Sequence, residues 1–202
     1  MSKQSTLFFD NFKQNSYKLC GIDEAGRGPI AGPLVVAGVV LKSDIKDLND
    51  SKKLTSKKRK ELYEIIKKSS KYYIYLVDAK KIDNFGLSKA INESLKAIKN
   101  FFSKDVEFLF DGNSSFGVDG INTLIKADQK VKEVSAASIL AKVFRDNLMQ
   151  EYAKIYPEYG FEKHKGYATK AHLEAIKKYG YCEIHRKSFK IKKTFTQLNL
   201  YN

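Results

Sequence analysis

The sequence predicts a single α/β domain in which one mixed β-sheet is flanked by helices. Three observations lead to this prediction. Segments typical of strands alternate along the chain with segments of helical periodicity. The length, 202 residues, is typical of one domain with a substantial core. No internal repeat, long linker or low-complexity block divides the chain.

The expected strands are short segments rich in β-branched, aromatic and other apolar residues. They cover residues 18–23, 33–41, 72–77, 106–110 and 121–125. A turn rich in glycine and proline joins the first strand to the second, and the fourth strand ends directly in the sequence Asp111-Gly112-Asn113.

Four segments of helical periodicity complete the pattern. They run from Thr55 or Ser56 onward, from Ser88 onward, from about Ser135 toward Tyr156, and over residues 169–179. The first is expected to place Leu62, Ile65 and Ile66 on one apolar face. Pro157 should end the third helix, and Gly180 is suited to the C-cap of the last.

The net charge of +14 is concentrated in two segments. Residues 51–71 carry nine basic against two acidic side chains, and residues 161–193 carry ten against three. A solvated lysine-rich surface explains either segment taken alone. Two such segments beside an otherwise neutral body favour a polyanionic partner such as nucleic acid.

Other features exclude several classes of protein. The longest apolar run is too short to span a bilayer, and the N-terminus lacks the apolar region of a signal peptide. The two cysteines, Cys20 and Cys182, lie far apart and without metal-ligand spacing. We therefore expect a cytoplasmic protein with neither a disulfide nor a zinc site, and we expect a monomer.

Four acidic residues occupy related positions in this scheme. Asp23 and Glu24 end the first strand, Asp111 ends the fourth, and Asp128 follows the fifth. Neighbouring strands lie about 4.8 Å apart, and open α/β sheets bind ligands at strand ends. Carboxylates gathered there repel one another, which favours raised pKa values or divalent cations such as Mg²⁺ or Mn²⁺. Each acid taken singly also fits a turn or cap residue.

The motifs around these acids resemble those of bacterial ribonuclease HII over nearly the whole chain. The similar blocks, in the same order, are DEAGRGP (23–29), LNDSKKLT (48–55), FDGN (110–113), KAD (126–128), SAASILAKVFRD (135–146) and HKGYATKAH (164–172). The resemblance implies a ribonuclease H-like fold, with a five-stranded mixed sheet, flanking helices and a helical C-terminal region. Residues 1–202 would form one catalytic domain, with residues from about 161 to 202 as a basic helical extension of it.

The resemblance also implies an activity and roles for single residues. The activity is endonucleolytic cleavage of RNA in RNA/DNA hybrids and at ribonucleotides embedded in duplex DNA, leaving 3′-hydroxyl and 5′-phosphate ends. Asp23, Glu24, Asp111 and Asp128 match the catalytic acids, which hold two Mg²⁺ or Mn²⁺ ions in such enzymes. An alternative on the same fold is a protein that binds nucleic acid without cutting it.

The resemblance also implies which residues contact the substrate. Gly26, Arg27 and Gly28 match the segment that reads the ribose 2′-hydroxyl, chiefly through backbone groups, because a backbone can approach a sugar only where no Cβ intervenes; a plain tight turn is the alternative. Tyr167 matches a tyrosine that stacks on the neighbouring deoxyribose, although a tyrosine taken alone also fits a core or surface position. Phosphate contacts are implied for Lys52, Lys53, Ser138, Lys142 and His164. His172 and His185 are expected to be helix-surface or structural residues.

Two further hypotheses concern the glycine-rich turn and the C-terminus. The first is that the turn GRGPIAG binds a nucleoside triphosphate, but this turn lacks the lysine and the spacing of such a site. The sequence QLNLY, from Gln197 to Tyr201, resembles the short peptide by which bacterial DNA enzymes dock on the sliding clamp. The alternative is that Leu198 and Leu200 fold back onto the protein's own surface.

Overall fold

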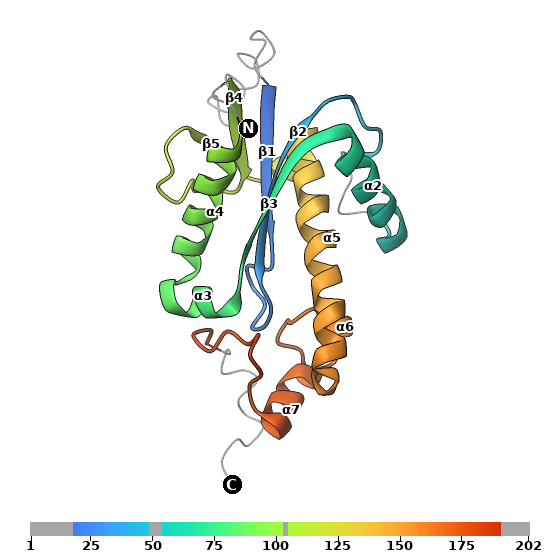
Figure 1. Ribbon diagram of the computed structural model, residues 1–202, viewed down its shortest axis with the longest axis vertical. Coiled ribbons are helices and arrows are strands. Elements are labelled where there is room, and N and C mark those ends of the chain that lie inside the picture. The colour runs from blue at the N-terminus through green and yellow to red at the C-terminus, as the bar shows by residue number, and fades with distance from the viewer. Residues whose placement is uncertain (1–17, 49–53, 103–104, 191–202) are drawn as a thin grey trace.

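The computed structural model describes residues 18–48, 54–102 and 105–190, and its centre is a five-stranded sheet (Figure 1). The strands are β1 (Lys18–Ala25), β2 (Leu34–Leu41), β3 (Ser70–Val77), β4 (Val106–Asp111) and β5 (Ile121–Leu124). Their order across the sheet is β3-β2-β1-β4-β5. The β1–β2 and β2–β3 pairs are antiparallel, whereas β1–β4 and β4–β5 are parallel. The predicted mixed sheet is confirmed.

Helices follow the strands in the expected alternation, with additions. They are α2 (Ser56–Ser69), α3 (Ala79–Phe85), α4 (Leu87–Phe101), α5 (Lys132–Ile155), α6 (Phe161–His164) and α7 (Lys170–Tyr179), with short 3₁₀ turns η2 (Ala127–Gln129) and η3 (Pro157–Tyr159). Thr55 caps α2, because its hydroxyl accepts a hydrogen bond from the N–H of Lys58 at 3.2 Å. Gly180 ends α7 as predicted. The helices α3 and α6 were not predicted.

The alternation of β2 divides the core into two layers. Leu34 and Val36 pack with α4 on one face of the sheet, whereas Val35, Ala37 and Val39 pack with α2 and α5 on the other. Figure 1 shows α4 on one side of the sheet and α2 with α5 on the opposite side. All five of these β2 side chains are fully buried, which explains why the strand is an unbroken apolar run.

The helix α5 lies unusually close to β1. A Cβ at Gly21 would stand 2.1 Å from the backbone carbon of Glu133, so only glycine fits there. Small residues, Ala136, Ala137 and Ala141, continue the contact along the buried face of α5. This close approach brings the side chains of α5 next to the end of β1, where the acidic residues lie.

The structure corrects several predicted boundaries and one apolar face. β1 continues to Ala25, which pairs with Val35, so Asp23 and Glu24 belong to the strand. Ile65 is 44% exposed, because α2 buries only the narrow stripe of Leu62 and Ile66. Ile125, which is 61% exposed, lies beyond the end of β5. The helix α5 begins three residues earlier than predicted.

The C-terminal elements close one end of the sheet. Figure 1 shows α6 and α7 beside the loop that joins β1 to β2. Met149 of α5 packs there with Tyr159, Phe161 and Ile184. Residues 181–190, which we call the C-terminal segment, are not helical, so the predicted helical extension holds only as far as α7. No helix among the described residues is long and apolar enough to cross a membrane.

Candidate active site

The acidic residues meet at one end of the two central parallel strands. In the β1–β4 register Ile22 pairs with Phe110, so Asp23 and Asp111 are the next residues of the two strands. The carboxylate of Asp111 accepts a hydrogen bond from the N–H of Ala127 at 2.8 Å. This bond brings η2, which contains the buried Asp128, to the end of β4. Three segments distant in sequence therefore supply the four acids.

Burial and mutual repulsion raise the pKa values of the β1 acids. Asp23 is only 7% exposed, and the pKa of its carboxyl is raised well above the usual range by burial first and then by Glu24. Hydrogen bonds from the Ser138 hydroxyl and from the N–H of Glu24 oppose this rise. Burial likewise raises the pKa of Glu24 to about 7, although Arg27, 3.7 Å from its carboxylate, lowers it. The charge of Asp111 also raises the pKa values of Asp23 and Glu24, so the three carboxylates lie close enough to repel one another.

These acids fit a divalent cation by their chemistry. All their side-chain donors are oxygen atoms, which Mg²⁺ and Mn²⁺ prefer. Oxygen Oε2 of Glu24 is buried and has no hydrogen-bond partner among the residues that the structure describes. Within those same residues, no three or more His, Cys, Asp or Glu side chains already form a metal-binding group. The acids therefore suit a cation by their oxygen donors and their negative charge, although their side chains do not already form a complete set of metal ligands.

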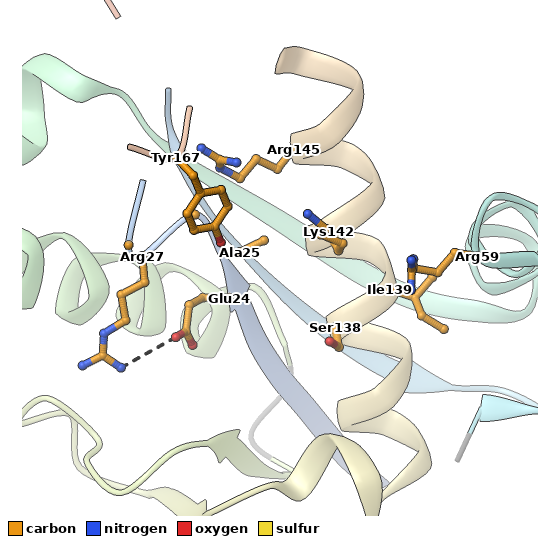
Figure 2. A pocket seen from close by; sticks show the side chains of 11 residues that line it. Glu24, Ala25, Arg27, Arg59, Ser138, Ile139, Lys142, Arg145 and Tyr167 are labelled. Carbon is orange, nitrogen blue, oxygen red and sulfur yellow. Dashed lines mark ion pairs between the residues drawn. The ribbon is translucent and has the colours of Figure 1, made fainter. Parts of the chain in front are cut away.

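A cleft of about 370 Å³ opens beside Glu24 (Figure 2). The turn Gly26-Arg27-Gly28 forms one wall, Ser138 and Lys142 of α5 form another, and Tyr167 stands over it. The dashed line in Figure 2 joins Arg27 to Glu24, the ion pair described above. The predicted recognition turn, two of the predicted phosphate contacts and the predicted stacking tyrosine thus line one cleft.

The two glycines of this turn differ in their surroundings. Gly26 has a φ of +91°, and a Cβ there would stand 2.1 Å from Nε of Arg145, on the inner side of the turn. Gly28 faces the cleft, where a Cβ would meet only Cε1 of Tyr167, at 3.8 Å. Gly26 is therefore needed for packing against Arg145, whereas no atom of the described residues crowds Gly28, and the contact of Gly28 with a sugar stays a prediction.

Tyr167 is held by its backbone and leaves its ring accessible. Tyr167 is 48% exposed, and its backbone N–H donates to the carbonyl of His164 at 2.9 Å. A core role is thereby excluded. In Figure 2 the ring projects over the end of β1, near Arg27 and Glu24.

The remaining predicted contacts differ in where they lie. Lys142 lines the cleft and forms an ion pair with Asp146 at 2.8 Å. Ser138 lines the cleft and also contacts the carboxylate of Asp23. Lys52 and Lys53 lie outside the described residues.

The three histidines form one group, in which His172 and His185 are buried and His164 is partly buried. His164 does not line the cleft: its Nε2 lies 2.8 Å from the carbonyl oxygen of Tyr159, and its Nδ1 accepts from the N–H of Gly166 at 3.2 Å. Its ring stacks on that of His172, with centroids 4.3 Å apart. His172 and His185 are both buried, so neither is a surface residue, and their structural interpretation holds.

Sequence reasoning missed two arginines of the cleft. Arg59 reaches it from α2, and Arg145 reaches it from α5. Arg145 had a recognisable signal, because Ala141, Arg145 and Met149 recur every four residues along the buried face of a helix. Arg59 had none, since it is one of several basic residues in its segment.

Carboxylates at the ends of parallel central strands, in this mixed sheet and beside a cleft lined with basic side chains, define a ribonuclease H-like nuclease. The family model described as "Ribonuclease HII" matches residues 20–192. The chain belongs to the ribonuclease HII family, whose members are endonucleases that act on RNA/DNA hybrids.

Individual relatives agree with this assignment. The chain is 60% identical over 180 residues to ribonuclease HII of Sulfurovum sp. (strain NBC37-1), covering 89% of this chain and 95% of the relative. Ribonuclease H2 of Pyrococcus horikoshii OT3 is similar in structure, with a TM-score of 0.70, 29% identity and coverage of 89% and 97% of the two chains. Ribonuclease HII of Archaeoglobus fulgidus, solved in complex with PCNA, gives a TM-score of 0.69, 28% identity and coverage of 87% and 96%.

Proposed function

We propose that this protein uses divalent metal ions to cleave the RNA strand of RNA/DNA hybrids and to incise duplex DNA at single embedded ribonucleotides, leaving 3′-hydroxyl and 5′-phosphate ends. The observation that carries the proposal is the juxtaposition of buried acids of raised pKa with a cleft walled by Gly28 and Tyr167. The first feature suits phosphodiester hydrolysis, and the second suits recognition of a sugar.

Asp23, Glu24, Asp111 and Asp128 are the residues that would hold the metal. A pair of bound Mg²⁺ or Mn²⁺ ions supplies Lewis acidity that activates water and neutralises charge at the scissile phosphate. The protein's own contribution is positioning. Ser138 orients the carboxylate of Asp23, and the N–H of Ala127 orients that of Asp111. Such hydrogen bonds fix the acids before substrate arrives.

Recognition of the ribonucleotide falls to the opposite wall of the cleft. The backbone of the Gly26-Arg27-Gly28 turn would approach the 2′-hydroxyl, and the exposed ring of Tyr167 would stack on the adjoining sugar. The 2′-hydroxyl is the group that distinguishes RNA from DNA at a single position. Lys142 and Arg59, which line the cleft from neighbouring helices, would contact the phosphates of the strand.

The test is incubation with Mg²⁺ or Mn²⁺ and a labelled DNA duplex that contains one ribonucleotide. Incision at that nucleotide, absent from the all-DNA duplex and abolished by EDTA, is the expected result. A protein that binds the duplex tightly but cuts neither it nor a long hybrid would instead be a non-catalytic binding protein.

We also propose that residues 197–201 dock on the sliding clamp. These residues lie outside the described part of the chain, so the support comes from the sequence QLNLY and from the related Archaeoglobus protein, which was solved bound to PCNA. Docking would raise the local concentration of the enzyme on newly copied DNA, in the bacterial cytoplasm, without changing the chemical step.

Deletion of residues 197–202 tests this second proposal. Clamp pull-down should be lost, while incision of a short oligonucleotide stays within about twofold of wild type because the cleft is untouched. Lost activity or a lowered melting temperature would show that the tail is structural.

A further inference from the structure

Two arginines are buried behind the recognition turn without an anionic partner. Arg145 of α5 and Arg186 of the C-terminal segment are each 1% exposed. Neither guanidinium forms a salt bridge with a carboxylate in the described part of the chain. Burial, and next the charge of Arg145, lowers the pKa of Arg186 to about 9. Charged groups are rarely kept in such surroundings unless their hydrogen bonds serve a purpose.

Every guanidinium nitrogen instead donates to a backbone carbonyl, and five of the six carbonyls belong to the loop between β1 and β2. Arg186 donates to the carbonyls of Gly26 at 2.7 Å, Gly32 at 2.9 Å and Arg27 at 3.3 Å. Arg145 donates to Pro33 at 2.9 Å, Ala31 at 3.1 Å and Lys165 at 2.9 Å.

These bonds decide which way the peptide groups of the turn face. In a trans peptide the C=O and the following N–H point in opposite directions, and none of the described peptide bonds is cis. The carbonyls of Gly26 and Arg27 are drawn inward to Arg186, so the N–H groups of Arg27 and Gly28 are turned away from it. Neither N–H has an acceptor among the described residues, and both residues line the cleft.

The same loop is tied to Tyr167. The N–H groups of Ile30 and Ala31 both donate to the carbonyl of Gly166, at 3.0 and 3.2 Å, directly before the tyrosine. On the other side, the N–H of Arg186 donates to the carbonyl of Ile30 at 2.8 Å. Loop, tyrosine and C-terminal segment therefore form one hydrogen-bonded unit around Arg186.

We propose that Arg186 is a positioning residue that sets the preference for ribose over deoxyribose, by holding the N–H groups of Arg27 and Gly28 toward the substrate. The inference rests on the proposed recognition of single ribonucleotides and adds its structural cause. Arginine is required because its planar fork serves three carbonyls at once, whereas a lysine at this position is a single point donor.

The experiment measures equilibrium binding to two DNA duplexes, one with a single ribonucleotide and one without, in EDTA so that no cleavage occurs. The readout is the ratio of the two dissociation constants. In Arg186→Lys this ratio should fall about tenfold, the value of one hydrogen bond to the ribose hydroxyl, with affinity for the all-DNA duplex unchanged. A merely structural loss lowers the folded fraction and affects both duplexes equally.

A control and a second variant complete the design. Ile98→Ala, which opens a cavity under α4 on the other face of the sheet, should lower the melting temperature without changing the ratio. Asp83→Ala removes the carboxylate that accepts from the N–H groups of Lys187 and Ser188, and so loosens the segment that carries Arg186. It should lower the ratio by about threefold.

The outcomes separate the inference from the proposed function. A folded Arg186→Lys protein whose ratio stays within about twofold of wild type overturns the role of Arg186. Should that variant fail to fold, an unchanged ratio in Asp83→Ala overturns it. Equal binding of both duplexes by the wild type would overturn the proposed ribonucleotide recognition itself.

Discussion

The carboxylate of Asp111 offers a direct test of the acidic site at the scale of single residues. Asp111→Asn keeps the acceptor for the N–H of Ala127 but removes one negative charge from the proposed metal ligands. Hybrid binding should persist, whereas cleavage in Mg²⁺ should fall by orders of magnitude, measured by single-turnover kinetics. Asp119→Asn, the same change at an exposed position of the following loop, is the control. Activity within about tenfold of wild type would remove Asp111 from the site.

Replacement of Tyr167 tests the proposed recognition of the ribonucleotide. Tyr167→Ala should reduce incision at a single ribonucleotide by at least about tenfold, because the stacking surface is lost. The melting temperature should change by less than about 2 °C, since nearly half of the residue is exposed. Tyr179→Ala, at a residue of similar exposure outside the cleft, should leave incision unchanged. A large loss of stability with unchanged activity per folded molecule would indicate a structural tyrosine.

Single residues also show how far sequence reasoning reaches. The four acids were predicted as site residues because motifs and strand ends pointed to the same positions. Arg186 was missed, because the carbonyls of Gly32 and Gly26 that it contacts lie 154 and 160 residues earlier in the chain. Backbone carbonyls carry no side-chain signature, so no local pattern reveals that an arginine will be buried against them.

At the scale of elements, α7 is attached through a chain of neutral histidines. Nδ1 of His172 lies 2.8 Å from the carbonyl oxygen of Tyr167, and its Nε2 lies 3.0 Å from Nε2 of His185. Nδ1 of His185 accepts from the N–H of Cys182 at 2.9 Å. With His172 donating through Nδ1 and His185 through Nε2, a neutral pair satisfies these three contacts. A second proton on His172 would place an N–H against the N–H of His185.

This arrangement predicts how stability depends on pH. Burial lowers the pKa of both His172 and His185 to about 4, below the value of about 6.5 in an unfolded chain. The unfolded state therefore binds more protons than the folded state between pH 6.5 and 4. The stability that the neutral histidines contribute is thus fully present above pH 6.5 and is lost as the pH falls. The difference in unfolding free energy between wild type and His172→Gln should shrink by about 1–2 kcal/mol from pH 7 to 4.5.

Urea unfolding at several pH values measures that difference. Using a difference matters, because the buried acids Asp23 and Glu24 have raised pKa values and contribute with the opposite sign over the same range. Their contribution is common to both proteins and cancels. A difference that stays constant from pH 7 to 4.5 would show that His172 does not change its protonation on unfolding in this range.

Some helices and strands could be predicted from the sequence and others could not. The strands were predicted from β-branched and aromatic runs, and α5 from its length and its terminal proline. The helix α3 was not, since seven residues are too few to display a periodic face, and Gly86, with a φ of 82°, separates it from α4. The C-terminal segment has no periodicity at all, because its hydrogen bonds go to the β1–β2 loop and to Asp83.

At the scale of the whole molecule, each of the two basic segments supplies one residue to the same cleft. The first contributes Arg59 of α2, and the second contributes Tyr167. The charge pattern therefore pointed to two segments that meet at one cleft, whereas the other basic residues of its lining, Arg27, Lys142 and Arg145, lie outside both segments. Such an arrangement is consistent with one catalytic domain, which stays our prediction for residues 1–202.

The charge distribution predicts the salt dependence of binding to an RNA/DNA hybrid. Each lysine that contacts a phosphate releases counterions, so the affinity should fall steeply with salt, and the slope of log K against log [salt] should lessen by roughly one unit per contact removed. Lys163 and Lys170 flank the Tyr167 turn and are exposed. Changing both to Gln should flatten the slope by about two. Lys89→Gln with Lys96→Gln, on α4 across the sheet, removes the same charge and should lower affinity only slightly, with the slope unchanged. Equal flattening by the two pairs would mean that net charge alone, and not the surface around Tyr167, holds the duplex.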